Sequence, residues 1–459
     1  MSELTPVELV QMDRARFNRY RQNLDFYRGN QWLERSRNRQ LVFNYTRTAV
    51  DKITSHLMQG MGFSCQPVNN TEEAAAQARE AEQLIYRVYQ DNNLEEIDYE
   101  TEIDAAIMGD GCYKVTWDTR EGRVRITSPD VNGLYAWWLG DDLSQVWRVA
   151  SRYQLGKDEI DMLYNIRITA KTAVITEIWQ ADRFQLFLNN DPIDDKPNPY
   201  GFIPFVIFPN LREPKHFWGM SDIPRMTEAQ RELNRALTQL SRILEVSGNP
   251  IAVLEGVESS EGIKVQPGAV WNLPEESKAY LLDLLQGGGI RLHIDYIDLV
   301  YRCLHDISEA PRAAYGGMER DLSGTALEVE LQSLLQKVSR KRVIRTSAYT
   351  LRNRMVLRLY KKYGGRDLTG VSQRIIWGPV LPQDRAREAK NEQVLVQAGV
   401  HSRRTAMDEM GVRDPDVEFE RWMEERRRIL EMNNRYRVRS NGGSERERGT
   451  ATEAALVPE

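Results

Sequence analysis

The hydrophobic positions follow two different periods along the first half of the chain. Apolar residues recur at helical spacing over residues 1–60 and again over 71–92 and 95–108, which predicts amphipathic helices. From Gly111 the period changes to two, which predicts β-strands at residues 112–117, 123–127, 144–149, 173–179 and 184–188. A β-rich layer preceded and followed by helices predicts an α+β fold over residues 1–220.

A helical hairpin is predicted in the middle of the chain. Residues 222–246 carry apolar side chains at spacings of three and four, and residues 290–309 carry a second such stripe. Between them, short strand-like runs occur at residues 251–254, 263–265 and 269–273, in a region rich in glutamate. The pattern therefore indicates two helices joined by a small acidic β segment.

Residues 310–324 are rich in proline and glycine and predict a loop, and a long helix is expected from Ser323 to about Tyr363. The second half of this helix is very basic. Its basic residues are Lys337, Arg340, Lys341, Arg342, Arg345, Arg352, Arg354, Arg358, Lys361 and Lys362. A solvated face, a subunit contact and a nucleic-acid surface are all compatible with this pattern.

Residues 14–39 combine basic residues with aromatic ones, which again leaves two interpretations. Either the aromatic side chains pack inward from a solvated helix, or the segment is a nucleic-acid surface. Near the other end, further helices are expected at residues 382–399, 403–410 and 416–432. Residues 436–459 lack apolar periodicity and are expected to be disordered.

The composition of the 459 residues indicates a soluble intracellular protein. Hydrophobic residues make up 41% and charged residues 28%, and no apolar run approaches the ~20 residues of a membrane helix. The N-terminus lacks the features of a secretory signal, and three widely separated cysteines fit a reducing compartment. The formal charge of -5 lacks the positive excess that is usual for proteins that wrap nucleic acid.

Catalytic motifs are absent from the sequence. It contains no phosphate-binding loop, H-E-x-x-H, C-x-x-C or G-x-S-x-G motif, and its five histidines are widely scattered. Paired acids such as Asp141-Asp142 and Asp194-Asp195 are weak candidates for a metal site, because such sites need acids from several segments. We therefore expect a protein that is not an enzyme, with no catalytic residue, metal or cofactor.

Four stretches of the sequence, taken in order, resemble the portal proteins of tailed double-stranded DNA bacteriophages. The four stretches are FYRGNQW at 26–32 with NYTRTAVDKI at 44–53; GMSDI at 219–223 followed by Gln230-x-x-x-Asn234; SGTALE at 323–328; and GVHSRRT at 399–405 with MGV at 410–412 and Glu418-x-Glu420. Their order along residues 1–435 carries the resemblance more than any one stretch does.

The resemblance implies a portal-protein fold whose subunits form a ring, of about twelve copies, at one capsid vertex. It implies an α/β wing at 1–220, a stem of two helices at 221–247 and 288–309, and a clip at 248–287. It also implies a tunnel loop at 310–324, a long helix returning to the wing at 325–379 and a helical crown at 380–435. The implied location is the virion, after assembly in the host cytoplasm.

The resemblance also implies partners. They are double-stranded DNA in the channel, the terminase large subunit, the head–tail adaptor, and the major capsid and scaffolding proteins, with no membrane. Acids in the channel would let DNA slide, because tight phosphate contacts would retard it. The candidates for facing the lumen are Asp295, Asp298, Asp306 and Glu309.

The other site residues expected from this resemblance fall into three groups. In the tunnel loop, Arg312 and Arg320 are expected to touch DNA, and Tyr315 and Met318 to pack against neighbouring loops. The docking surface for the motor and adaptor is expected at Glu255, Glu258, Glu261, Trp271, Glu275 and Glu276. The seams between subunits are expected at Leu233, Leu237, Leu240, Leu292, Tyr296 and Leu299.

Two other classes of function compete with this one. A metal-dependent nucleic-acid-processing enzyme would use the abundant carboxylates as ligands. A non-viral oligomeric scaffold would keep the helical seams but would need no DNA partner. Nuclease or ATPase activity would favour the enzyme, and an assembled particle without a central channel would favour the scaffold.

Overall fold

The computed structural model describes residues 5–33, 40–69, 71–248, 251–256, 277–282, 289–315, 324–380, 385–412 and 415–441. The chain divides into two compact units, Met1–Val380 and Leu381–Glu459. Within the described residues, no helix combines the length and the apolar character that crossing a bilayer requires.

The first unit begins with a series of helices. They are α1 (Pro6–Gln11), α2 (Arg14–Tyr27), α3 (Tyr45–Met58), α4 (Glu72–Asp91) and α5 (Leu94–Met108). Side-chain oxygens cap two of them: Asn44 accepts from the Arg47 N–H at α3, and Thr71 accepts from the Ala74 N–H at α4. The stripes expected on α3 and α4 are buried, which confirms these helices.

Antiparallel sheets follow the helices. One sheet has the order β3-β2-β9, formed by Arg123–Thr127, Asp110–Asp118 and Phe205–Pro209. The other has the order β4-β5-β6-β7-β8, formed by Leu134–Leu139, Asp142–Gly156, Thr172–Gln180, Arg183–Leu188 and Asp191–Pro197. The 3-10 turn η1 (Val131–Gly133) precedes β4, and α6 (Lys157–Tyr164) follows β5. All five predicted strands are confirmed, and the α+β class holds.

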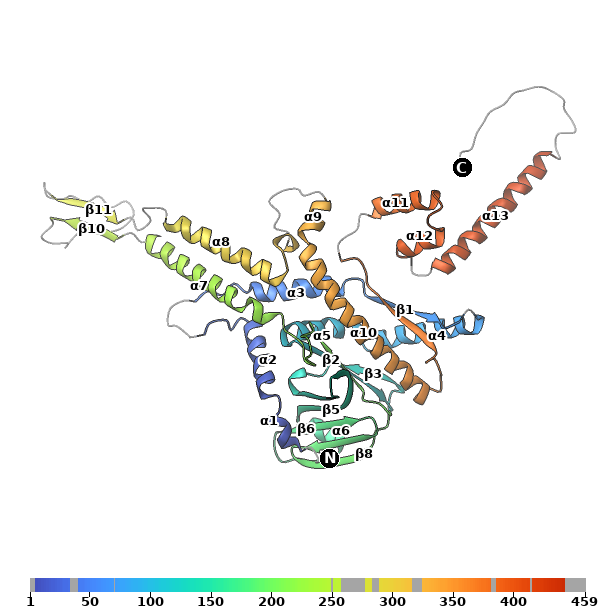
Figure 1. Ribbon diagram of the computed structural model, residues 1–459, viewed down its shortest axis with the longest axis horizontal. Helices are drawn as coiled ribbons and strands as arrows, with labels where there is room; N and C mark the ends of the chain where they lie inside the picture. The colour runs from blue at the N-terminus through green and yellow to red at the C-terminus, as the bar shows by residue number, and fades with distance from the viewer. Residues whose placement is uncertain are drawn as a thin grey trace, which may run out of the picture. The chain divides into compact units, whose positions relative to one another are not determined.

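A helical hairpin extends from this body (Figure 1). It consists of α7 (Ile223–Gly248), the paired strands β10 (Ile251–Glu255) and β11 (Lys278–Leu282), and α8 (Gly289–Ser308). The two predicted helices and the first predicted strand are confirmed. The predicted strands at 263–265 and 269–273 lie outside the described residues.

The chain then returns to the body through a short 3-10 turn, η2 (Arg312–Tyr315), and two further helices. These are α9 (Gly324–Glu330) and α10 (Gln332–Tyr363), so the predicted long helix is interrupted at Leu331. After α10, strand β12 (Val371–Ile376) pairs antiparallel with β1 (Gly62–Pro67) near the N-terminus. This pairing places α10 inside the first unit.

The second unit is helical, with α11 (Arg385–Gln397), α12 (Arg403–Glu409) and α13 (Pro415–Asn441). The Ser402 side chain caps α12 by accepting from the Thr405 N–H at 3.0 Å. The expectation of disorder from residue 436 onwards was wrong for 436–441, because α13 continues to Asn441. Its sequence there is rich in helix-compatible arginine although it lacks an apolar stripe.

Buried apolar side chains in the first unit form separate clusters, and one of them joins the hairpin to the N-terminal helices. It includes Phe26 of α2, Val50 of α3, Leu233 of α7 and Leu304 of α8. The aromatic residues Phe17, Tyr20 and Phe26 of α2 are all buried. For the segment at 14–39, the structure therefore bears out inward packing of these aromatic side chains.

Candidate functional site

The candidate site is the junction where the hairpin meets the body. The segment entering α7 crosses the end of α5 at very short range: a Cβ placed on Gly219 would lie 2.4 Å from the Gly109 carbonyl oxygen. Gly109 itself has φ +110°, a conformation that side-chain-bearing residues rarely adopt. The Ser221 hydroxyl then donates to the Ile107 carbonyl oxygen at 2.6 Å. These contacts fix the point at which α7 begins.

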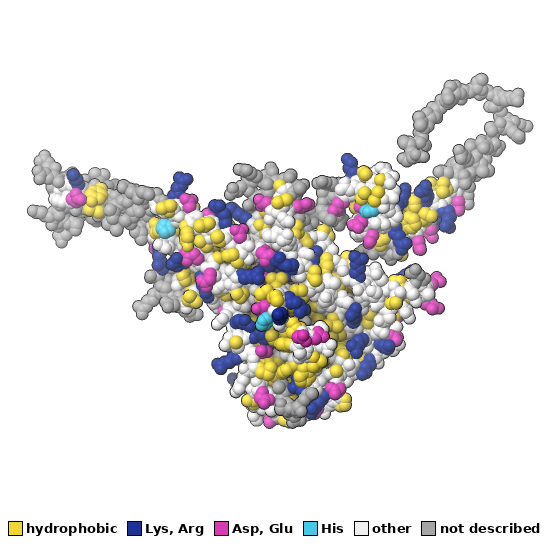
Figure 2. Space-filling model, in the orientation of Figure 1, with side chains coloured by type: hydrophobic (Ala, Val, Ile, Leu, Met, Phe, Trp, Pro, Cys, Tyr) yellow, Lys and Arg dark blue, Asp and Glu magenta, His cyan; other side chains and the backbone are white. Residues whose placement is uncertain are grey.

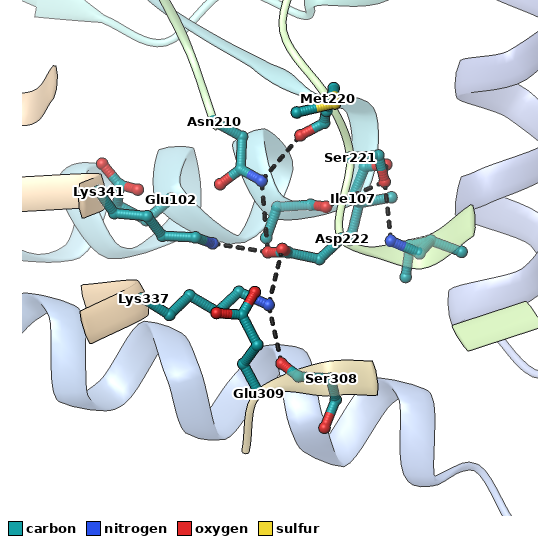
Figure 3. A network of polar contacts seen from close by, with 12 residues as sticks. Glu102, Ile107, Asn210, Met220, Ser221, Asp222, Ser308, Glu309, Lys337 and Lys341 are labelled. Carbon is teal, nitrogen blue, oxygen red and sulfur yellow. Dashed lines mark hydrogen bonds and ion pairs between the residues drawn. The ribbon is translucent and has the colours of Figure 1, made fainter. Parts of the chain in front are cut away.

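Asp222, the residue before α7, is the centre of the junction (Figure 3). Its Oδ1 atom lies 3.0 Å from Nζ of Lys337 and its Oδ2 atom 2.6 Å from Nζ of Lys341. The Asn210 side chain donates to Oδ2 at 3.3 Å. All three charged side chains are almost completely buried, so α7 is held to α10 by an ion-pair network without solvent.

The charges of this network shift the pKa of its members. Burial raises the pKa of Asp222, but the ammonium groups of Lys337 and Lys341 outweigh burial and bring it well below its usual range. Burial lowers the pKa of Lys341 to about 8, although Asp222 opposes that change. After burial, the nearby positive charges of Lys337 and Arg345 also lower the pKa of Lys341.

The end of α8 joins the same network. The Lys337 ammonium group also donates to the Ser308 carbonyl oxygen at 2.9 Å. The next residue, Glu309, forms an ion pair with Arg340 of α10 and lies 3.8 Å from Arg225 of α7. Both ends of the hairpin are therefore bound to one stretch of α10 (Figure 3).

Other basic residues of α10 form buried ion pairs with α5. Arg345 donates to both Glu102 carboxylate oxygens at 2.9 Å, and Arg352 forms a two-point pair with Asp98. Arg345, Glu102, Arg352 and Asp98 are completely buried. Arg342 donates to backbone carbonyl oxygens, including that of Gly378 at 2.7 Å.

These contacts correct the interpretation of the basic helix. Lys337, Lys341, Arg345 and Arg352 are neither a solvated face nor a nucleic-acid surface, because they neutralise acids of the same chain. The sequence did not show that these positions are buried, because on the buried face of α10 cations stand among the apolar residues. Charged groups are buried in this way only when they are paired.

A second polar cluster holds the N-terminal segment against α7. The Gln230 side chain accepts from the Thr46 N–H at 3.1 Å and donates to the Phe43 carbonyl oxygen at 2.7 Å. One turn later, Asn234 accepts from the Phe43 N–H at 3.0 Å and donates to the side-chain oxygen of Gln31 at 2.7 Å. Two of the sequence stretches that carry the family resemblance thus contact each other directly.

The described residues of the expected tunnel loop contact the same chain. The Arg312 guanidinium carbon lies 6.0 Å from the Tyr301 ring centroid, and the Tyr315 ring centroid lies 5.2 Å from that of His305. Tyr315 is thus packed on α8 of its own subunit. Met318 and Arg320 lie outside the described residues.

The expected acidic residues Asp295, Asp298 and Asp306 share one face of α8, as their spacings of 3 and 8 residues require. Asp295 and Asp306 are exposed, and Asp298 pairs with Arg302 one turn later. Glu309 lies just beyond α8 and belongs to the junction, where Arg340 neutralises it. It therefore stands apart from the other three acids.

The residues expected at subunit seams divide into two groups. Leu233 is only 1% exposed, because it packs between α7 and α8 of the same chain, and Leu237 and Leu240 are partly buried. Leu292 and Leu299 are 71% and 55% exposed, and Tyr296 donates to Glu232 of α7 at 2.8 Å. Leu233 thus supports the fold of one subunit, whereas Leu292 and Leu299 leave an open apolar surface.

Of the residues expected to dock a motor, only Glu255 is described. It ends β10 and accepts a hydrogen bond of 2.9 Å from the Tyr280 hydroxyl on β11. Glu258, Glu261, Trp271, Glu275 and Glu276 lie outside the described residues.

Sequence reasoning missed Asp222, Asn210, Lys337 and Lys341 as a group. One signal was present: Lys337 and Lys341 are four residues apart and so share a helix face. Their partner comes from a segment more than 100 residues earlier, and no local pattern links the two. Across the described ranges, no group of three or more His, Cys, Asp and Glu side chains has the geometry of a metal site.

The polar groups of the junction bond mainly to one another, as in a structural joint. The fold is that of an α+β protein with a projecting helical hairpin. The family model for phage portal proteins of the SPP1 Gp6-like type matches residues 9–432. This match covers most of the chain, so the chain belongs to the phage portal protein family, a family of structural proteins. No curated protein matches the chain.

Proposed function

We propose that this chain forms a ring at one vertex of a phage capsid and that double-stranded DNA passes through the ring during packaging and ejection. Membership of the portal family supports this proposal. The observation that carries it is the apolar stripe left open on α8, where Leu292, Leu299 and Cys303 are exposed. Figure 2 shows hydrophobic side chains on the surface of this hairpin.

A closed ring of identical subunits needs two different complementary faces on each copy. Leu292, Tyr296, Leu299 and Cys303 follow one another at spacings of three and four, so they form one continuous stripe along α8. A stripe of this kind packs against a helix of a neighbour. In the proposed ring, α8 of one subunit contacts the hairpin of the next, with about twelve copies closing the circle.

The acidic face of α8 supports a channel lined by negative charge. Asp295 and Asp306 are exposed and lie along the same side of α8 as the apolar stripe, and in the proposed ring they stay in solvent at the edge of the subunit contact. Carboxylates repel phosphates and do not hold DNA in place. Asp295, Asp298 and Asp306 are therefore our proposed lumen residues.

We propose further that the tip of the hairpin, residues 248–287, docks the terminase large subunit and later the head–tail adaptor. The sequence of this tip is acidic, and a docking partner with a basic surface would complement it. ATP hydrolysis belongs to the motor, because this sequence has no nucleotide-binding motif. The major capsid and scaffolding proteins are the proposed partners at the vertex.

Disruption of the gene in the phage that encodes the chain tests this function. Without the chain, we expect capsids that contain no packaged genome, and we expect the wild-type gene supplied in trans to restore filled heads. Pulsed-field electrophoresis of nuclease-treated particles measures the protected DNA. Full-length protected DNA in particles that lack the chain would contradict the proposal.

A further inference from the structure

A basic pocket lies between the N-terminal helices and the five-stranded sheet, in the wing region and away from the hairpin. Its volume is about 640 Å³. Arg14 and Arg21 of α2 and Arg152 of β5 line it together with Phe17, Val10 and Asn132. Three guanidinium groups from two separate elements therefore converge on one concavity.

The backbone positions these arginines. Arg14, Phe17 and Arg21 are spaced by three and four residues, so they project from one face of α2. On the opposite wall, a Cβ placed on Gly133 would lie 2.0 Å from the Arg152 carbonyl oxygen, so the close approach of η1 to β5 requires glycine here. The pocket is thus part of the folded wing.

The pocket carries positive charge that the described part of the chain does not neutralise. No carboxylate lines it, and Arg14, Arg21 and Arg152 form no ion pair with a described residue. The neighbouring Arg16 differs, because it is buried and its guanidinium pairs with Asp13 at 2.9 Å. Unpaired guanidinium groups in a concave site favour an oxyanion ligand.

The lining of the pocket indicates which kind of anion fits, because an apolar side chain lies among the arginines. A peptide offers a carboxylate together with an apolar side chain, whereas a phosphodiester offers only acceptor oxygens. Val10, which is 47% exposed, adds an apolar wall. We propose that this pocket binds an acidic segment of a partner protein that also carries an apolar side chain.

Nucleic acid fits this surface less well. The aromatic residues that accompany the arginines in the sequence, Phe17, Tyr20 and Phe26, are all buried in the structure. They therefore offer no platform on which bases could stack. A duplex is also convex, and its backbone would span the pocket instead of entering it. The site goes beyond the channel function and does not depend on it.

Fluorescence anisotropy with the purified full-length chain tests the proposal. The probe is a labelled 16-residue peptide of alternating glutamate and leucine, and the matched probe replaces each glutamate with glutamine. The variant R21Q/R152Q removes two of the three charges of the pocket. The control R167Q removes a charge from an exposed residue outside the pocket.

We expect the acidic peptide to bind wild type and R167Q with equal affinity. We expect it to bind R21Q/R152Q at least about tenfold more weakly, because this variant loses hydrogen bonds to charged groups. We expect the glutamine peptide to bind none of the three proteins measurably. Equal binding to R21Q/R152Q and wild type, or no binding of the acidic peptide, overturns the proposal.

Two further measurements distinguish other occupants. A labelled 16-base-pair duplex that binds more tightly than the peptide, and loses affinity in R21Q/R152Q, would assign the pocket to nucleic acid and overturn the proposal. Loss of oligomers in R21Q/R152Q by size-exclusion chromatography, with circular dichroism unchanged, would assign it to a second copy of the chain. Unchanged oligomers with weakened peptide binding support the proposal.

Discussion

The Oδ2 atom of Asp222 lies 2.6 Å from the ammonium nitrogen of Lys341, and both side chains are almost completely buried. The pair connects the first residue of the hairpin segment to the long helix α10, and Lys337 binds the other carboxylate oxygen. One carboxylate shared by two lysines is therefore among the contacts that hold the start of the hairpin to α10.

Replacing Asp222 with asparagine should destabilise the chain strongly. The substitution leaves the ammonium groups of Lys337 and Lys341 buried without a counter-charge, which costs about 3–5 kcal/mol of unfolding free energy. Urea denaturation followed by circular dichroism measures this change. The matched control is D295N, an exposed aspartate on α8, for which we expect a change within about 0.5 kcal/mol. Equal stability of D222N and D295N would show that the network carries little energy.

The junction also predicts a dependence of stability on pH. Because burial lowers the pKa of Lys341 to about 8 from an ordinary value of 10.5, the folded chain releases this proton earlier than the unfolded chain. Between these two pH values the unfolded chain holds more protons, so the unfolding free energy rises with pH.

The variant K341M isolates this effect. From pH 8 to pH 10 we expect the wild type to gain about 1–3 kcal/mol of unfolding free energy relative to K341M, which has no proton to release. Urea midpoints for both proteins across this range give the difference. A constant difference between wild type and K341M would mean that Lys341 keeps its ordinary pKa.

The polar contact between α7 and the N-terminal segment should be equally sensitive to substitution. In Q230L, the Thr46 N–H and the Phe43 carbonyl oxygen lose their side-chain partner in a buried site, at a cost of about 2–4 kcal/mol. Hydrogen exchange should increase at residues 43–46. The control Q239L changes an exposed glutamine of the same helix, and protection at 43–46 should be unaffected. Unchanged exchange in Q230L would refute this role.

The exposed stripe of α8 is the proposed contact between subunits. The variant L292D/L299D should fold normally, because both side chains are exposed in the single chain, but it should fail to form rings. Sedimentation velocity measures the assembly, and circular dichroism checks the fold. The control M162D changes another exposed apolar residue, on α6, and should assemble as the wild type does.

The native Cys303 offers an independent check of this contact. It is exposed, whereas Cys65 and Cys112 are buried, so a thiol reagent reports on α8 selectively. We expect Cys303 to react readily in the monomer and at least about tenfold more slowly in the assembled particle. Equal reaction rates in the two states would place the subunit contact elsewhere.

The two arginines of the proposed tunnel loop provide a test of DNA contact. Replacing Arg312 and Arg320 with glutamine should reduce packaging or retention of DNA, because each can bind a phosphate. Ring assembly should be unaffected. The amount of nuclease-protected DNA per capsid, compared with that for R167Q, measures the effect. Unchanged packaging would show that these arginines do not handle DNA.

The sequence was sufficient for much of the local structure. The leucines of residues 222–246 and the alternating residues of 173–179 predicted α7 and β6, because periodicity reports which side of an element is buried. Thr71 and Ser402 cap the starts of α4 and α12, where serine and threonine are favoured. These signals are local, so one sequence contains them.

Long-range pairing could not be predicted in the same way. Strand β1 pairs with β12, in which Phe63 lies opposite Ile375, and no pattern near either strand indicates the other. The basic residues of α10 could not be interpreted from the sequence for a related reason. Arg345 and Arg352 are buried against acids of α5, which lie far away in the sequence. Charged residues are exposed on average, so their presence in a sequence predicts a solvated surface. Only the three-dimensional structure shows that a counter-ion is buried beside Arg345 and Arg352.

The measurement that tests the portal assignment most directly is the mass and projection of the purified particle. Native mass spectrometry gives the number of subunits, and negative-stain images show whether the particle has a central hole. The account predicts a ring of about a dozen copies around an open channel. A closed dimer or tetramer without a channel would contradict it.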